Sequence, residues 1–148
     1  MHKIYYFDKM TDLNSDDSLE NAYFGPSAIV GALYTDEPEM LEAVILAGGD
    51  VNAELEYGGT PMHTAMELAI DGMLQNNKES PYPKALEMIR ILVSHGADVE
   101  KKDWEGKTPL DCLNTYSGSE QAFNSLVNMF KDVIPSLEER IQYQKQII

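Results

Sequence analysis

Apolar residues recur along this chain at the spacing of helices that each bury one side. Two stripes with intervals of one, three and four residues consist of Met40, Leu41, Val44 and Ile45 and of Met88, Ile89, Leu92 and Val93. Such a stripe is typical of an amphipathic helix that packs against neighbouring helices. The pattern therefore predicts a helix around each stripe.

The residues that flank these stripes indicate where the helices begin and end. Asp36-Glu37-Pro38 places an acid that can cap a helix before a proline in the first turn. Gly48 and Gly96 follow the two stripes. A chain often leaves a helix through a left-handed residue, a conformation that glycine adopts at little cost. We therefore expect the two helices to close at these glycines.

The closing glycines belong to a longer pattern that occurs twice. Residues 48–52 (GGDVN) return as residues 96–100 (GADVE), and residues 58–63 (GGTPMH) return at the same spacing as residues 106–111 (GKTPLD). A segment that recurs at fixed spacing is one supersecondary unit, which stacks on its copies because it cannot bury its apolar side alone. The sequence thus predicts a short solenoid, an architecture that usually works as a binding surface.

Alignment on these landmarks divides the chain into three units, residues 22–54, 55–102 and 103–135. The second unit is 15 residues longer than the first, with the surplus at residues 69–83. Part of that surplus has the Asn, Ser and Pro content of a loop, which is either a binding loop or a tolerated surface insertion. In the third unit a second helix is expected over residues 121–130.

The two ends of the chain are expected to cover the ends of the stack. Residues 1–21 are predicted to be an N-terminal capping segment. Residues 136–148 follow Pro135 and are predicted to form one C-terminal capping helix. Its apolar side is marked by residues spaced by four, three and four, namely Leu137, Ile141, Gln144 and Ile148.

These motifs resemble the ankyrin repeat, in which Gly-x-Thr-Pro-Leu-His-x-Ala opens a first helix and a second helix ends in Gly-Ala-Asp-Val-Asn. Residues 58–65 (GGTPMHTA) and 103–110 (DWEGKTPL) match the opening motif closely, whereas residues 25–32 (GPSAIVGA) are a degenerate version. The resemblance covers roughly residues 22–135. It implies an all-α ankyrin-repeat solenoid of about three repeats, each with two helices and a β-turn or hairpin.

The resemblance also implies structural roles at the repeated positions. His63 occupies the position where the family's histidine bonds the turn backbone and links adjacent units, so we expect a structural rather than a catalytic residue. The full structural set is Thr60, Pro61, His63, Gly96, Thr108 and Pro109. The third unit departs from the family motif because Asp111 stands in place of histidine.

Charge is distributed unevenly along the chain. The net charge is −14, and residues 10–77 contain thirteen acids without a single Lys or Arg. Such a field repels phosphate backbones and anionic membranes and speeds encounter with a basic protein. The pattern therefore favours a basic protein partner over a nucleic acid or a membrane, with solubility alone as the alternative.

In ankyrin proteins, partners generally contact the turn tips and the exposed side of the first helices. Each unit here carries an aromatic residue at the turn tip, and aromatic residues are enriched among interface hot spots. The expected partner-binding residues are Tyr23, Phe24, Tyr34, Glu54, Glu56, Tyr57, Glu67, Trp104 and Glu105. For Tyr23 and Phe24, packing beneath the N-terminal segment is the alternative.

The residue types of catalytic and metal sites occur without the necessary spacing. The three His and the one Cys lack the paired short spacings of a zinc site. Cys112 is expected to be a buried small hydrophobe, and Gly106-Lys107-Thr108 lacks the upstream glycine of a phosphate loop. We expect no catalytic residue, no metal and no cofactor. The lone cysteine and the absence of an apolar run favour a cytoplasmic protein.

The predicted function is a non-catalytic protein–protein interaction module. Small acidic ankyrin proteins resemble immunity proteins that bacteria pair with secreted toxins, which implies an inhibitor of a basic toxin. The alternatives are an adaptor or regulatory scaffold that recruits a cellular protein and, third, a small enzyme. The sequence leaves the oligomeric state open.

Overall fold

The computed structural model describes residues 26–145, and this part of the chain is helical without a strand. Its elements are α2 (Pro26–Tyr34), α3 (Pro38–Leu46), η1 (Glu56–Gly58), α4 (Pro61–Gln75), α5 (Pro83–Ser94), η2 (Pro109–Asp111), α6 (Cys112–Thr115), α7 (Glu120–Phe130) and α8 (Leu137–Arg140). The described residues therefore have the all-α composition that the sequence predicts. The N-terminal capping segment predicted over residues 1–21 lies outside the described residues.

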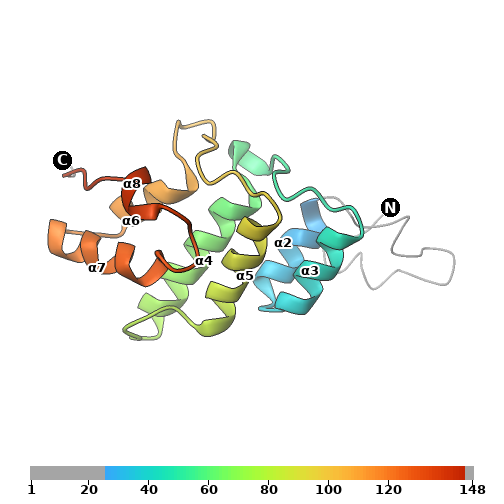
Figure 1. The fold of residues 1–148 in the computed structure, drawn as a ribbon, viewed down its shortest axis with the longest axis horizontal. Helices are drawn as coiled ribbons and strands as arrows, with labels where there is room; N and C mark the ends of the chain where they lie inside the picture. The colour runs from blue at the N-terminus through green and yellow to red at the C-terminus, as the bar shows by residue number, and fades with distance from the viewer. Residues whose placement is uncertain (1–25, 146–148) are drawn as a thin grey trace, which may run out of the picture.

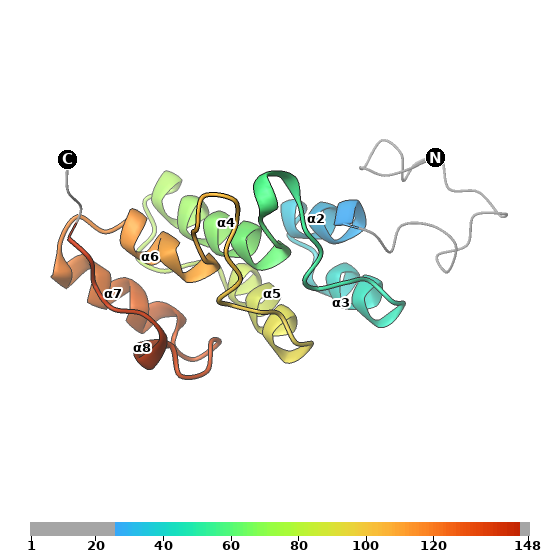
Figure 2. The same ribbon diagram turned by 90° about the horizontal axis from the view of Figure 1, so that it is seen from above.

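The helices are arranged as pairs that stack side by side (Figure 1). Within pairs, α2 packs on α3 and α4 on α5, while α6 contacts α7. Between pairs, α2 packs on α4, α3 on α5, and α4 on η2. Figure 2 shows α2, α4 and α6 in one row and α3, α5 and α7 in a second row. Two layers of helices thus share one core.

Most of the two apolar stripes of the sequence lies in this core, although Met40 is exposed and Val93 is half-buried. Leu41, Val44 and Ile45 of α3 are buried, as are Ile89 and Leu92 of α5. The buried residues form one continuous cluster from Ala28 in α2 to Leu137 in α8. The core therefore runs through all the stacked pairs, as expected for units that bury their apolar sides against one another.

The predicted helix ends are confirmed at the closing glycines, whereas the predicted acidic cap at the start of α3 is absent. Gly48 and Gly96 have φ values of 116° and 94°, so both helices close through the left-handed residue that the sequence predicts. At the start of α3, the predicted capping acid makes no side-chain bond. Glu37 is the N-cap residue, and Asp36 lies in a left-handed turn with φ of 60°. Pro38 in the first turn therefore begins this helix without an acidic cap.

The loops between the pairs do not contain the strands of a hairpin. In the first loop the Leu55 N–H donates to the Gly59 carbonyl (2.7 Å) and the Gly58 N–H to the Leu55 carbonyl (3.1 Å); in the second, the Asp103 N–H donates to the Lys107 carbonyl (2.8 Å) and the Gly106 N–H to the Asp103 carbonyl (2.9 Å). These bonds close tight turns but do not extend into the ladder of two paired strands. The predicted hairpin is therefore replaced by tight loop tips, the first of which contains η1.

The surplus of the second unit is divided between helix and loop. Helix α4 has 15 residues, whereas α2 has nine, and it continues to Gln75. Residues 69–75 of the surplus are therefore helical, and the chain is irregular only over residues 76–82 before α5. Buried Ile70 and Met73 explain the extra turns, because they continue the apolar side of α4.

The C-terminal helix predicted over residues 136–148 is wrong for the described residues that follow Arg140. Helix α8 ends at Arg140, and Ile141 has the extended angles φ −146° and ψ 145°. The side-chain amide of Asn114 donates to the Gln142 carbonyl (3.0 Å) and accepts from the Gln144 N–H (2.7 Å). Asn114 is only 5% exposed, so these bonds stabilise the extended backbone in place of a helical ladder.

A candidate interaction surface at the turn tips

His63 joins the second and third units through both nitrogens of its ring. Its Nδ1 accepts a hydrogen bond from the Thr60 backbone N–H at 2.9 Å, so the ring proton lies on Nε2. Nε2 donates to the Lys107 carbonyl oxygen at 2.9 Å. The Thr60 hydroxyl also lies 3.0 Å from Nδ1. With both nitrogens engaged, the imidazole fixes two successive loops relative to each other.

In the third unit, Asp111 makes the first of these contacts, to the backbone of its own unit, but not the second. The Thr108 backbone N–H donates to the Asp111 carboxylate at 2.8 Å, as the corresponding Thr60 N–H does to His63. A carboxylate only accepts, so Asp111 does not donate onward as the imidazole does. Pro61 and Pro109 stand in the first turns of their helices and are buried.

The Gly96 turn is tied to the preceding unit through Asn52. The Asn52 side chain donates to the Gly96 carbonyl (3.1 Å) and accepts from the Asp98 N–H (2.7 Å). Nearby, the His95 ring lies 3.2 Å from a carboxylate oxygen of Glu42. Of the positions assigned to structure, His63 and Gly96 thus lie at junctions between units.

Tyr57 and Trp104 form an exposed aromatic pair at the tips of two successive loops. Their rings meet edge to face, with centroids 6.3 Å apart at 81°. The side chains remain 73% and 71% exposed. The Trp104 backbone N–H donates to the Tyr57 carbonyl at 3.0 Å, which ties the tips together.

Gly58 makes room for this pair. Its φ is +78°, and a Cβ added there would lie 2.4 Å from Cδ1 of the Trp104 indole. Tyr57 itself has φ of 62°, a left-handed conformation that is unfavourable for a bulky residue. The loop therefore holds the two rings in a fixed arrangement at some backbone cost.

Acidic side chains surround the aromatic pair. Glu56 and Glu105 are its exposed neighbours in sequence, and Glu54 is also exposed. A hollow of about 240 Å³ lies beside His63, and its wall contains four acids but only one cation, Lys107. The acids are Glu67, Asp103, Glu105 and Asp111. The hollow is therefore strongly negative.

The surroundings of Glu67 in the hollow raise its proton affinity. Burial raises the pKa of Glu67, and Asp71 and Asp103 raise it further, while His63 opposes the shift. Burial also raises the pKa of Tyr116 to about 12, together with its hydrogen bond to Asp71. These directions indicate partly desolvated negative charge that outweighs the one cation of the wall, Lys107.

Cys112 lies at the base of this hollow and is chemically quiet. Burial raises the pKa of its thiol, and the Sγ donates to the Pro109 carbonyl at 3.1 Å. Because the thiolate is the nucleophilic form, this cysteine is protonated and unreactive at neutral pH. The residue fills the buried position that the sequence predicts.

The structure brings together only part of the predicted binding set. Tyr57, Trp104, Glu56 and Glu105 share the loop tips, with Glu67 beside them in the hollow. Tyr34 is 57% exposed, but it is the last residue of α2, at the end of that helix remote from η1 (Figure 1). It belongs to neither of the two loop tips. Tyr23 and Phe24 lie outside the described residues.

Sequence reasoning missed Asp103 and Tyr116, which line the hollow, and Asp71, which interacts with Glu67 and Tyr116. The role of Gly58 in the site could have been suspected from the sequence, because this glycine belongs to the repeated motif at residues 58–61 (GGTP) and 106–109 (GKTP).

Within residues 26–145, no group of three or more His, Cys, Asp or Glu is placed to hold a metal ion. No helix in the same range has the length and apolar content to cross a membrane.

Comparison with known proteins finds short matches. The chain is 35% identical over 78 residues to potassium channel AKT1 of Oryza sativa, which covers 53% of this chain and 7% of the channel. With potassium channel AKT1 of Arabidopsis thaliana it is 33% identical over 73 residues, or 49% of this chain and 7% of the channel. No protein family model matches the chain.

A further match covers more of the chain. An ankyrin repeat protein of Rickettsia felis is 27% identical over 109 residues, which is 72% of this chain and 42% of that protein. The chain thus spans less than half the length of these curated relatives. Most of this helical chain is therefore similar in sequence to part of an ankyrin repeat protein.

Proposed function

We propose that residues 22–135 form an ankyrin-repeat solenoid of about three repeats that binds a basic protein partner and catalyses no reaction. The stacked helix pairs, the His63 bridge between successive loops and the similarity to the Rickettsia felis protein support this assignment. The observation that carries the functional part is the exposed Tyr57–Trp104 pair. Two large aromatic rings fixed in solvent contribute little to folding but suit an interface hot spot.

The pair is organised in advance for binding. Its loops are joined by the bond from Trp104 to Tyr57, and Gly58 lets the indole lie close to the backbone. A surface that is already ordered loses less conformational entropy when a partner binds. The rings therefore act as anchors, and the loops around them need not rearrange.

The acidic hollow gives the partner its charge preference. Glu67 is held beside Asp71 and Asp103 although burial raises its pKa, so its charge is unfavourable in the free protein. A Lys or Arg side chain entering the hollow would compensate this charge. The overall charge of −14 adds a longer-range attraction that raises the association rate.

The proposal includes no catalysis and no cofactor. His63 has both ring nitrogens occupied, the Cys112 thiol is buried with a raised pKa, and His95 lies against Glu42. These side chains are therefore poor candidates for a nucleophile or a general base. A cytoplasmic location, without nucleic acid or membrane binding, is part of the same proposal.

A basic toxin that the chain inhibits would fit this chemistry, and this is the role that we propose for the surface. An adaptor that recruits a cellular protein would use the same rings with less dependence on charge. Salt separates these two roles, because screening weakens charge attraction but leaves apolar contacts largely intact. Glu56, Glu67 and Glu105 are the acids on which the salt effect should depend.

The experiment compares proteins captured from the native source by three immobilised chains at low and physiological salt. The chains are the unaltered protein, the double variant Tyr57→Ala/Trp104→Ala, and the control Tyr34→Ala, which removes an exposed aromatic at the C-terminal end of α2, outside the two loops. A basic protein should be retained by the first and third chains, lost from the double variant, and released by salt. Equal retention by all three chains would refute the tip surface, and a neutral, salt-resistant partner would favour the adaptor role.

A further inference from the structure

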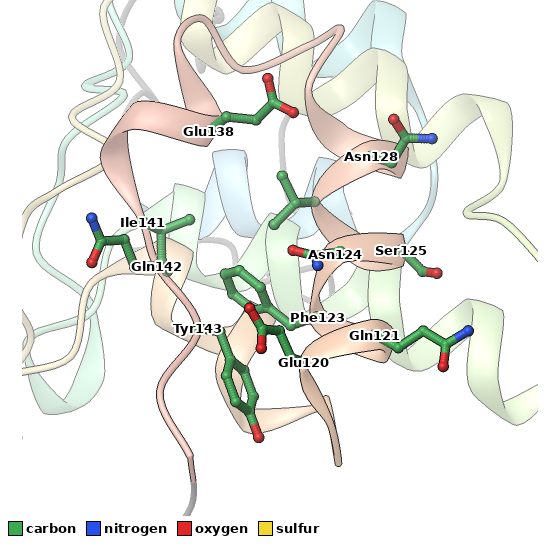
Figure 3. Close-up of a pocket in the computed structure, with 11 residues that line it drawn as sticks. Glu120, Gln121, Phe123, Asn124, Ser125, Asn128, Glu138, Ile141, Gln142 and Tyr143 are labelled. Carbon is green, nitrogen blue, oxygen red and sulfur yellow. The ribbon is translucent and has the colours of Figure 1, made fainter.

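A second hollow lies at the opposite end of the stack from α2. It has a volume of about 1220 Å³ and lies between α7 and the segment that includes α8 and residues 141–143 (Figure 3). Its lining includes Glu120, Phe123, Asn124, Glu138 and Tyr143. We call this hollow the C-terminal groove.

The groove has an apolar base. Phe123 and Val127 of α7 are buried, while Ile141 and Tyr143 are partly buried against the core. The Phe123 and Tyr143 rings lie 5.7 Å apart at 55°. In Figure 3 the Ile141 side chain and the Asn124 amide both extend into the space between α7 and the segment after α8, residues 141–145, which we call the tail. The groove therefore offers apolar contact beside an amide that both donates and accepts hydrogen bonds.

The tail also has an open backbone edge. Asn114 pairs with the Gln142 carbonyl and the Gln144 N–H, which lie on one edge of the extended segment. Successive residues of an extended chain direct these groups to opposite edges. The N–H and carbonyl of Tyr143 therefore lie on the other edge, and neither is hydrogen-bonded to any residue within 26–145. An extended peptide can add to such an edge as a further strand.

Charge indicates which peptide fits. Glu138 lies at one end of the groove and Glu120 at the other in Figure 3. No Lys or Arg is among the described residues that line it. Charge complementarity therefore favours a segment in which basic residues flank an apolar one.

We propose that the C-terminal groove binds an extended, basic and apolar peptide segment of a protein partner. The peptide backbone pairs with the free edge at Tyr143, an apolar side chain lies on Phe123 and Ile141, and Lys or Arg side chains face Glu120 and Glu138. This site does not depend on the turn tips, so it stands or falls separately from the proposed function.

The test uses the full chain and a fluorescent hexapeptide of alternating lysine and valine, with binding measured by anisotropy at low salt. Two comparison peptides replace lysine with glutamate or carry N-methyl groups on the backbone amides. Saturable binding is expected for the lysine peptide, and binding at least tenfold weaker for each comparison peptide. Equal binding of either comparison peptide, or no saturable binding of the lysine peptide, would overturn the proposal.

Variants locate the site. Glu120→Gln combined with Glu138→Gln should weaken binding by about fivefold, while Glu56→Gln combined with Glu105→Gln at the turn tips should leave it unchanged. The opposite result would place the peptide at the turn tips and overturn the proposal that it binds in the C-terminal groove.

Sedimentation equilibrium of the chain alone provides the other check. A monomer is expected, and a dimer that the lysine peptide dissociates would make a second copy the occupant instead.

Discussion

The Trp104 backbone N–H donates to the Tyr57 carbonyl oxygen at 3.0 Å, which ties the tip of one loop to the tip of the loop before it. The same two residues place their rings edge to face at 6.3 Å. Backbone and side chains thus act together to hold the exposed pair. The tip surface is therefore a fixed feature of the stack, and its rigidity can be tested.

Gly58→Ala tests how the indole is held. An added Cβ would lie 2.4 Å from Trp104, and φ of +78° is unfavourable for alanine, so we expect a loss of about 1 kcal/mol or more in unfolding free energy. Trp104 is the only tryptophan, so its fluorescence should change as well. Gly118→Ala is the control, because nothing lies within 4 Å of its added Cβ. Equal stability of the two variants would contradict this packing.

His63→Ala tests the bridge between units. The variant leaves the buried Thr60 N–H without its acceptor and the Lys107 carbonyl without its donor, so we expect a loss of about 2–3 kcal/mol by urea unfolding. His95→Ala removes an exposed contact with Glu42 and should cost under about 1 kcal/mol. Comparable losses for the two histidines would show that His63 does not hold the loops together.

Glu67→Gln tests how much the negative charge of Glu67 in the hollow lowers the free energy of unfolding. Burial raises the folded-state pKa of Glu67 above its unfolded value of 4.5. The stability contributed by such a group is fully present below pH 4.5 and is lost as the pH rises through the folded pKa. The variant should therefore be more stable than the unaltered chain at pH 7 and equally stable near pH 4. Denaturant unfolding at both pH values measures this, with exposed Glu54→Gln as the control. A destabilised variant at pH 7 would contradict the expected sign.

Tyr116→Phe tests the same region at alkaline pH. Burial and Asp71 raise the folded-state pKa of Tyr116 from 10.0 to about 12. Its contribution to stability is therefore complete below pH 10 and disappears as the pH rises toward 12. The unaltered chain should lose more stability over this interval than the phenylalanine variant. Parallel pH profiles for the two proteins would show that Tyr116 does not contribute.

Local signals predicted much of the fold. Gly48 and Gly96 close helices through positive φ, and α7 begins within one residue of the predicted start at Gln121. These features depend on nearby residues, so the sequence displays them directly. The extended tail does not, because Asn114 contacts Gln142 and Gln144 across a long stretch of sequence. Periodicity alone favoured a helix there.

The candidate site was predicted in part for the same reason. Tyr57 is the third residue of the second unit and Trp104 is the second residue of the third unit, so the repeat itself placed both at the turn tips of successive units. The hollow combines Glu67 of α4 with Asp103 and Tyr116 of the third unit, and Asp71 of α4 interacts with both Glu67 and Tyr116. Only the stacking of one unit on the next brings these groups together.

The most direct test of the proposed function is the dissociation constant of the captured basic partner, measured with the unaltered chain, Trp104→Ala and Tyr34→Ala. Loss of the indole should weaken binding by about tenfold or more, as expected for an aromatic hot spot, while Tyr34→Ala should bind like the unaltered chain. Unchanged affinity with Trp104→Ala would contradict the claim that the partner binds at the turn tips.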